Sequence, residues 1–271
     1  MRRTKVGVVQ VTSGPEVEPN LRAVERAVRG AAGDGAELVV VPESFAYLGP
    51  EEGQRRVAEP LPEGGPVLAR CRALAQERNV ELVLGGFWER AAGGAKVKNA
   101  CLHLRSDGTV AAIYRKIHLF DVDLPDGTRL LESEHVEPGR ELVVTDAPFG
   151  VLGLSVCYDL RFPELYRGLV DRGAVALAVP SAFTLTTGKD HWHVLLRARA
   201  IEQQCYVLAA AQAGHHWGRR VSYGHALIVD PWGTVVAECA DGEGWATAWL
   251  EPERVQRVRR QVPSLQHRVL K

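Results

Sequence analysis

Lysine is scarce in this sequence, and an excess of charge of either sign is absent. Six lysines stand beside twenty-seven arginines, and the 33 basic and 33 acidic residues cancel to a formal net charge of zero. A balanced chain has no overall field that would attract nucleic acid or an anionic membrane surface. There is also no apolar stretch long enough to cross a bilayer, and no signal-peptide-like region precedes the first predicted strand. We therefore expect a cytoplasmic protein whose partner is a small molecule, with no binding to nucleic acid or membrane.

Paired cysteines are lacking as well. The five cysteines are odd in number, are scattered and show no Cys-x-x-Cys spacing, which argues against a disulfide framework and against a structural zinc site. Four of them, Cys71, Cys101, Cys205 and Cys239, lie in helical or strand patterns, where a free cysteine acts as a small buried hydrophobic residue. Cys157 is the exception, because it follows a predicted strand directly.

Histidines with metal-binding spacing are also missing. His191 and His193 are two residues apart at the start of a predicted helix, a spacing that does not put both rings on one face. The pair His215 and His216 adjoins two arginines in a predicted loop. We expect these histidines to be surface or polar-pocket residues, and we predict neither a metal nor another cofactor.

Apolar residues in periodic runs are abundant. With 46% hydrophobic residues among 271, the chain can bury a sizeable core. Apolar spacing predicts helices at 20–33 with Asn20 as the cap, at 66–79, at 162–172, from Asp190 past Ile201, and from Pro252. Alternating or continuous apolar runs predict strands at 5–11, 37–41, 80–87, 99–104, 109–115, 151–156, 174–179, 205–212, 225–229, 234–238 and 244–250.

The order of these elements predicts an α/β fold. Strand–helix–strand units alternate with hairpins and no linker divides the chain, so we expect a single domain in which two mixed sheets are covered by helices. Residues 40–45 resemble residues 178–183, because both are apolar strands that end at Val-Pro, and this echo favours a pseudo-symmetric sandwich. The stretch 117–140 has no sustained period and is predicted to be a long loop, which in a compact domain is usually functional.

Three ionisable residues occupy the ends of predicted strands. Glu43 follows the run 37–42, Lys116 follows 109–115, and Cys157 follows 151–156. Groups beyond the strand ends of an α/β sheet face the crevice where ligands bind. A thiol needs a base near neutral pH because the thiolate is the reactive form, a carboxylate can take its proton, and an ammonium can stabilise the anions that follow. The alternative to a catalytic role is a purely structural one, in which Glu43 and Lys116 form an ordinary ion pair at the edge of the sheet.

These residues lie in motifs that resemble the nitrilase superfamily of carbon–nitrogen hydrolases, over nearly the whole chain. The motifs are Val41-Pro42-Glu43, the heptapeptide Tyr-Arg-Lys-Ile-His-Leu-Phe at 114–120, and Cys-Tyr-Asp-Leu-Arg-Phe-Pro-Glu at 157–164. The resemblance implies a four-layer α-β-β-α sandwich and a catalytic set of Glu43, Lys116 and Cys157. It also implies an active-site carboxylate at Glu132 and an oxyanion contact from the backbone N–H of Tyr158. Members of this superfamily associate as dimers or larger homo-oligomers, so a tail from about residue 252 is expected at a subunit interface.

Further segments resemble one branch of the superfamily, whose members hydrolyse amides of small 2-oxo acids. These segments are 132–134, 180–183, 191–202, 222–225 and 230–233. The resemblance implies hydrolysis of deaminated glutathione to 2-oxoglutarate and cysteinylglycine through a cysteine thioester. One alternative is an omega-amidase that acts on 2-oxoglutaramate or 2-oxosuccinamate. A second alternative is an interaction protein on a hydrolase scaffold that has lost its chemistry.

Substrate contacts are assigned to residues that follow the strand tips in the second half of the chain. These are Arg161, Phe162, Ser181, Ala182, Phe183, Thr187 and His191. For Arg161, a contact with a substrate carboxylate competes with a salt bridge to Asp159 or Glu164. For Glu132, a solvated loop acid is the competing interpretation.

Overall fold

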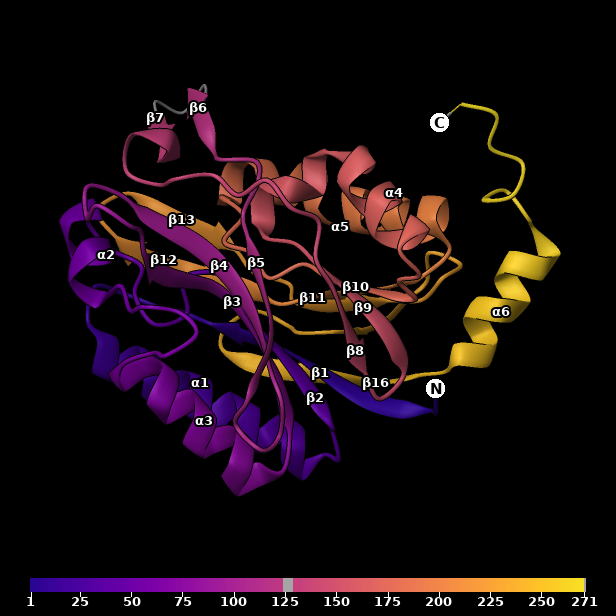
Figure 1. Cartoon of the computed structure of the whole chain (residues 1–271), viewed down its shortest axis with the longest axis horizontal. Coiled ribbons are helices and arrows are strands. Elements are labelled where there is room, and N and C mark those ends of the chain that lie inside the picture. The colour runs from indigo at the N-terminus through magenta and orange to yellow at the C-terminus, as the bar shows by residue number, and fades with distance from the viewer. Residues whose placement is uncertain (124–128, 271) are drawn as a thin grey trace.

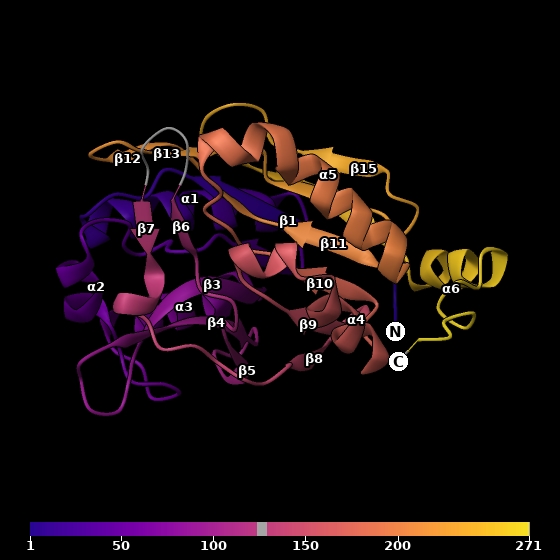
Figure 2. The same ribbon diagram turned by 90° about the horizontal axis from the view of Figure 1, so that it is seen from above.

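The computed structural model describes residues 1–123 and 129–270. Two sheets pack face to face, and helices cover both outer faces, as Figures 1 and 2 show. The predicted four-layer α-β-β-α sandwich is therefore confirmed.

The first sheet has eight strands in the order β13-β12-β1-β2-β3-β4-β5, with β16 also paired to β1. Its strands are β1 (Thr4–Val11), β2 (Leu38–Val41), β3 (Glu81–Arg90), β4 (Val97–Leu104), β5 (Val110–Arg115), β12 (Ala211–Trp217), β13 (Arg220–Tyr223) and β16 (Gly244–Leu250). Helices α1 (Val17–Gly33) and α3 (Pro66–Arg78) cover its outer face. Val39 and Val41 pack toward these helices, whereas Leu38 and Val40 pack between the sheets. Strand β2 is apolar throughout because both of its faces are buried.

The second sheet has six strands in the order β15-β14-β11-β10-β9-β8. Its strands are β8 (Val144–Ala147), β9 (Gly150–Leu154), β10 (Ala176–Ala178), β11 (Tyr206–Ala209), β14 (Leu227–Val229) and β15 (Val235–Glu238). Helices α4 (Pro163–Asp171) and α5 (Leu185–Gln203) lie on its outer face. Because β9, β10 and β11 are parallel, the loops that follow them emerge at one edge of the sheet.

Shorter elements complete the chain. They are α2 (Glu51–Val57), β6 (Asp121–Asp123), β7 (Arg129–Leu131), the 3₁₀ helices η1 (Glu132–Glu134) and η2 (Cys157–Arg161), and α6 (Pro252–Gln261). Helix α6 projects from one end of the molecule, the end at which the N-terminus also lies (Figures 1 and 2). None of the helices in the described ranges combines the length and the apolar character that a bilayer crossing requires.

One predicted strand is in fact two. The run 205–212 divides at Ala210 into β11, which belongs to the six-stranded sheet, and β12, which belongs to the eight-stranded sheet. The division leaves no trace in the hydrophobic pattern because the residues on both sides of it are buried. The chain thus passes from one layer to the other beside the edge where the loops after β9 and β10 lie.

The starts of two helices also differ from the prediction. Helix α5 begins at Leu185 and not at Asp190, because the Thr184 side chain caps it by accepting from the Thr187 N–H. Asn20 lies inside α1 instead of capping it, and its amide bonds the backbone of Gly14. In the predicted loop 117–140, β6, β7 and η1 form, while residues 124–128 lie outside the described part of the chain.

Candidate active site

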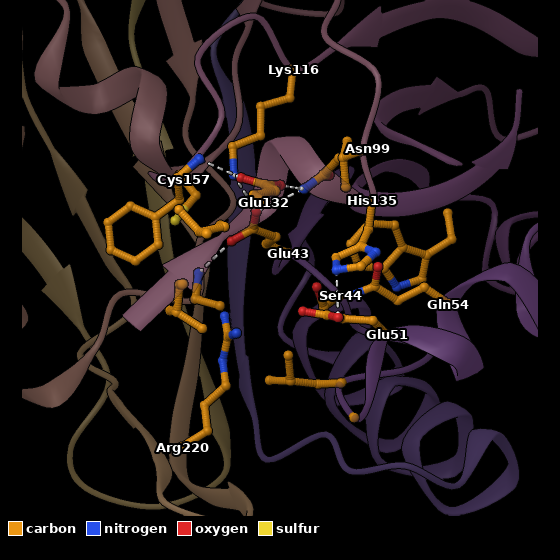
Figure 3. Close-up of a pocket in the computed structure, with 18 of the residues that line it drawn as sticks. Glu43, Ser44, Glu51, Gln54, Asn99, Lys116, Glu132, His135, Cys157 and Arg220 are labelled. Carbon is orange, nitrogen blue, oxygen red and sulfur yellow. Dashed lines mark hydrogen bonds and ion pairs between the residues drawn. The ribbon is translucent and has the colours of Figure 1, made fainter. Parts of the chain in front are cut away.

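The side chains of Glu43, Lys116 and Cys157 meet at one cavity, which is lined by residues that follow strands of both sheets. The cavity has a volume of about 90 Å³, and Glu132 and Ala182 also line it. Figure 3 shows Glu43, Lys116, Glu132 and Cys157 converging there from separate segments of the chain. All three groups that the sequence placed at strand ends are buried, with 5%, 2% and 7% of Glu43, Lys116 and Cys157 exposed.

Lys116 lies between the two carboxylates. Its Nζ donates to Glu43 Oε1 at 3.0 Å and to Glu132 Oε1 and Oε2 at 3.1 and 2.8 Å. Glu132 also accepts from the Phe120 N–H at 2.7 Å, so it is held to the loop that follows β5. Glu132 is therefore a partly buried member of the cluster and not a solvated loop acid.

Asn99 of β4 joins the same two carboxylates from the other side. Its Nδ2 donates to Glu43 Oε1 at 2.9 Å and to Glu132 Oε1 at 3.1 Å, whereas its buried Oδ1 has no partner. The sequence pattern gave no reason to select Asn99, because a polar residue at the start of a strand is unremarkable. The contact depends on the pairing of β4 with β3 and β5, which periodicity does not reveal.

The loop after β10 connects the acid to the thiol. The Ala182 N–H donates to Glu43 Oε2 at 3.0 Å, and the Pro180 carbonyl accepts from the Cys157 N–H at 3.0 Å. The two segments that echo each other in the sequence, 40–45 and 178–183, thus meet at their ends.

Cys157 occupies a tight turn between β9 and α4. Its φ of 48° lies in the left-handed region that non-glycine residues rarely adopt. The fully buried Asp159 stabilises this turn, since its carboxylate accepts from the Val156 N–H at 2.9 Å and from the Tyr114 hydroxyl at 2.7 Å. Asp159 also accepts from the His118 N–H at 3.1 Å, which ties the cysteine turn to the loop beyond Lys116.

Burial and charge set the protonation of the cluster. Burial alone would raise the pKa of the Glu43 carboxyl, but the Lys116 ammonium and hydrogen bonds outweigh it, and the pKa is lowered. Burial would lower the pKa of Lys116, yet the charges of Glu132 and Glu43 raise it. The pKa of the Cys157 thiol is raised well above its usual range, first by burial and then by the Glu43 charge. A neutral thiol therefore lies beside an ionised carboxylate that can accept its proton.

A second and smaller cavity, of about 10 Å³, adjoins the first at Phe120, Cys157 and Ala182. It is lined by Phe120, Cys157, Tyr158, Arg161, Ala182, Phe183, Thr184 and Thr187. Of the residues assigned to substrate contacts, Arg161, Ala182, Phe183 and Thr187 thus line it, whereas Phe162, Ser181 and His191 line neither cavity. Phe162 stacks on His118, and Ser181 Oγ bonds the Val179 carbonyl.

Arg161 does not form a salt bridge with Asp159 or Glu164, which was the alternative to a substrate contact. Its Nη1 lies 3.2 Å from His191 Nδ1, and its guanidinium carbon lies 5.2 Å from the centre of the Phe183 ring. In the described part of the chain, no carboxylate lies within ion-pair distance of this guanidinium.

Three possible metal ligands come together on the surface, away from both cavities. His193 Nε2 and His225 Nδ1 each lie within 2.9 Å of Glu238 Oε1. Both rings thus already have the carboxylate as a hydrogen-bond partner. His191, the other member of the sequence pair with His193, bonds Arg161 instead.

The sequence was compared with known protein families and with individual proteins, and both comparisons gave matches over nearly the whole chain. The profile of the carbon–nitrogen hydrolase family matches residues 5–260. The chain is 45% identical over 272 residues to a deaminated glutathione amidase of Synechocystis, and the match covers 99% of each protein.

Two solved structures extend the comparison. The crystal structure of the Caenorhabditis elegans NitFhit protein superimposes with a TM-score of 0.93 at 42% identity, covering 99% of this chain and 66% of that one. The amidase of Nesterenkonia gives a TM-score of 0.78 at 25% identity, covering 96% and 98% of the two chains. That structure is of a glutamate-to-glutamine mutant and shows Michael addition of acrylamide at the active-site cysteine.

Proposed function

Because the chain belongs to the carbon–nitrogen hydrolase family, we propose that it hydrolyses deaminated glutathione to 2-oxoglutarate and cysteinylglycine, with Glu43, Lys116 and Cys157 as its catalytic residues. The observation that carries the proposal is the convergence of these three side chains at one cavity. The high identity to deaminated glutathione amidases over nearly the full length supports the substrate.

The first step forms the carbon–sulfur bond. Glu43 takes the thiol proton as Cys157 Sγ attacks the amide carbonyl carbon, and the carbonyl oxygen becomes an oxyanion. As Glu43 becomes neutral, the Lys116 N–H that it had accepted turns to this oxygen, and the backbone N–H of Tyr158 donates to the same atom. A donor that is already in place where charge develops needs no reorganisation during the reaction.

The second step releases the amine. The proton held by Glu43 passes to the amide nitrogen, the carbon–nitrogen bond breaks, and a thioester of Cys157 remains. Water then attacks the thioester carbon while Glu43 takes a proton from that water. The carbon–sulfur bond breaks, the proton returns to the sulfur, and 2-oxoglutarate leaves.

Glu132 and Asn99 act by holding these groups in place. Glu132 accepts two hydrogen bonds from Lys116, and this interaction keeps the ammonium charged and oriented in a buried site. Asn99 donates to both carboxylates and so fixes Glu43 relative to Glu132. Both are positioning residues in this scheme.

We assign the 2-oxo acid end of the substrate to the side of Cys157 on which Arg161 and Thr187 lie, where the smaller cavity of about 10 Å³ would have to widen to hold it. Arg161 supplies a guanidinium without a carboxylate partner in the described chain, and Thr187 supplies a hydroxyl. An arginine beside aromatic rings is well suited to bind a carboxylate, because its planar fork matches the two oxygens.

A comparison of two substrates tests the proposal. Purified protein is given deaminated glutathione or 2-oxoglutaramate, and released 2-oxoglutarate is measured for each. We expect the larger kcat/KM for deaminated glutathione and no turnover of either compound by Cys157→Ala. A larger kcat/KM for 2-oxoglutaramate would identify an omega-amidase instead. A correctly folded wild-type protein that hydrolyses neither compound would support the second alternative, an interaction protein that has lost hydrolase activity.

We also propose that the enzyme is a cytoplasmic homo-oligomer. Val194 and Ile201, two turns apart on α5, are 66% and 51% exposed, and Val269 and Leu270 of the tail are 90% and 81% exposed. A second copy would cover such residues, and the five free cysteines suit a reducing compartment. Light scattering of the wild-type protein, of Val194→Glu and of a chain truncated after residue 261 tests this; monomeric wild-type protein would refute it.

A further inference from the structure

One arginine of the larger cavity plays no part in the scheme above. Arg220, the first residue of β13, lines the same cavity as Glu43, Lys116 and Cys157. Figure 3 shows its side chain extending toward the cluster from the wall opposite His135 and Gln54. The sequence pattern placed Arg220 in a loop beside His215 and His216, so this position at the start of a strand was not predicted.

The guanidinium of Arg220 is poorly satisfied within the protein. Its Nε is buried and has no hydrogen-bond partner, and no carboxylate of the described chain lies within ion-pair distance of it. A buried donor without a partner costs free energy unless a ligand or water binds it. Arg220 therefore has unused capacity to bind an anion.

The other basic side chains that line this cavity already have carboxylate partners. Lys116 is held by Glu43 and Glu132, and His135 Nε2 lies 2.5 Å from Glu51 Oε2. Among the described residues that line the cavity, Arg220 is therefore the one that offers an unpaired positive charge to an entering anionic group.

The proton transfer from Glu43 to the leaving nitrogen determines which end of the substrate points into this cavity. Glu43 must hand its proton to the leaving nitrogen, so the departing group has to extend from Cys157 on the side of Glu43. Glu43 lines the larger cavity and does not line the smaller one. The departing amine therefore points into the larger cavity, toward Arg220, and the acyl part points from Cys157 toward Arg161 on the other side.

We propose that Arg220 binds the carboxylate of the departing amine, and that this contact selects amides whose leaving group is a carboxylate-bearing peptide over amides that release ammonia. The inference rests on the proposed function and identifies the leaving-group subsite of the same active site. The guanidinium fork suits a carboxylate because it offers two parallel N–H donors. An amide that releases ammonia has no group to make this contact.

Two substrates that differ in one charge test the inference. The first is deaminated glutathione, and the second is the same compound with its glycine carboxylate converted to a primary amide. We expect the wild-type enzyme to prefer the charged compound by about tenfold to a hundredfold in kcat/KM, the range of one charge-assisted hydrogen bond. In Arg220→Ala this preference should fall close to one, mainly through KM, and Arg220→Lys should restore part of it.

Arg219→Ala is the matched control, because Arg219 is an exposed neighbour with the same charge and does not line the cavity. It should keep the wild-type preference. If Arg220→Ala does not fold, inhibition of the wild-type enzyme by cysteinylglycine and by its amide replaces it, and equal inhibition refutes the contact. If the wild type hydrolyses neither compound, the proposed function is wrong and the inference falls with it. If it hydrolyses both but Arg220→Ala lowers both equally, only the inference is wrong.

Discussion

Gly86 lies so close to Glu43 that no side chain fits between them. A Cβ atom on Gly86 would lie 2.6 Å from Glu43 Cγ and 2.2 Å from the Ser44 backbone nitrogen. Gly86 has a φ of 59° and belongs to an irregularity in the pairing of β3 with β4, between Leu84 and Phe87. A bulge in β3 thus makes the space in which the loop after β2 holds the Glu43 carboxylate.

Replacement of Gly86 by Ala should therefore displace Glu43. We expect at least a tenfold loss in kcat, because a small misplacement of a catalytic group is costly, together with a lower free energy of unfolding. Gly93→Ala is the control, since Gly93 also has a positive φ, of 90°, but nothing lies within 4 Å of its would-be Cβ. Gly93→Ala should lose about 1 kcal/mol of stability from backbone strain and keep full activity. Equal kinetics for the two variants would show that the contact with Glu43 does not matter.

Lys116→Met should remove the charge that holds the cluster together. Glu43 and Glu132 would then lie close together without a cation between them, and the oxyanion would lose a donor. We expect kcat to fall by about a hundredfold or more. The control is Lys98→Met, because Lys98 pairs with Glu137 at 3.5 Å on a more exposed part of β4. A Lys116→Met enzyme with nearly normal kcat would remove this lysine from the mechanism.

Glu43→Gln should affect reactivity and turnover in opposite directions. The Glu43 charge is one of the causes of the raised pKa of Cys157, and Lys116 acts to lower that pKa. Without the negative charge, the thiol pKa should fall and alkylation of Cys157 by iodoacetamide at neutral pH should accelerate. Hydrolysis should nevertheless fall by a hundredfold or more, because the leaving nitrogen receives no proton.

Mass spectrometry of the labelled cysteine across pH 6–10 measures this shift, and the other four cysteines are internal controls because none of them lines either cavity. A labelling profile that moves to higher pH in Glu43→Gln would contradict the assignment of Glu43 as the base. The glutamate-to-glutamine mutant of the Nesterenkonia amidase, whose active-site cysteine carries acrylamide, is a protein in which such a cysteine is open to alkylation.

The strand ends of the active site could be predicted from the sequence, but the walls of the cavity could not. Glu43, Lys116 and Cys157 each follow an apolar run, so periodicity marks them. Asn99 sits inside a strand pattern, and its role depends on which strands are neighbours. Arg220 opens a strand of only four residues with mixed burial, which has no readable period. The passage of the chain between the sheets at Ala210 was missed because apolar residues continue through it.

His216 should make the protein sensitive to acid. The ring is 8% exposed, Nδ1 lies 2.7 Å from the Ser13 carbonyl oxygen, and Nε2 lies 2.8 Å from Ser222 Oγ. The Ser13 carbonyl oxygen can only accept, so Nδ1 carries a proton and donates, and in the neutral ring Nε2 accepts from the Ser222 hydroxyl. Burial lowers the pKa of His216 from 6.5 to about 4.

The sign of the effect follows from proton counting. As the pH falls below 6.5 the unfolded chain takes up a proton at this ring, whereas the folded protein does so only near pH 4. The unfolded state therefore binds more protons in this window, and stability decreases as the pH falls, by about 3 kcal/mol for this one group. Urea unfolding at several pH values between 7 and 4 measures the loss. His216→Asn should be less stable at pH 7 but show a flatter dependence, while His267→Gln, at an exposed position, should keep the wild-type slope. An unchanged slope in His216→Asn would mean that other groups cause the acid sensitivity.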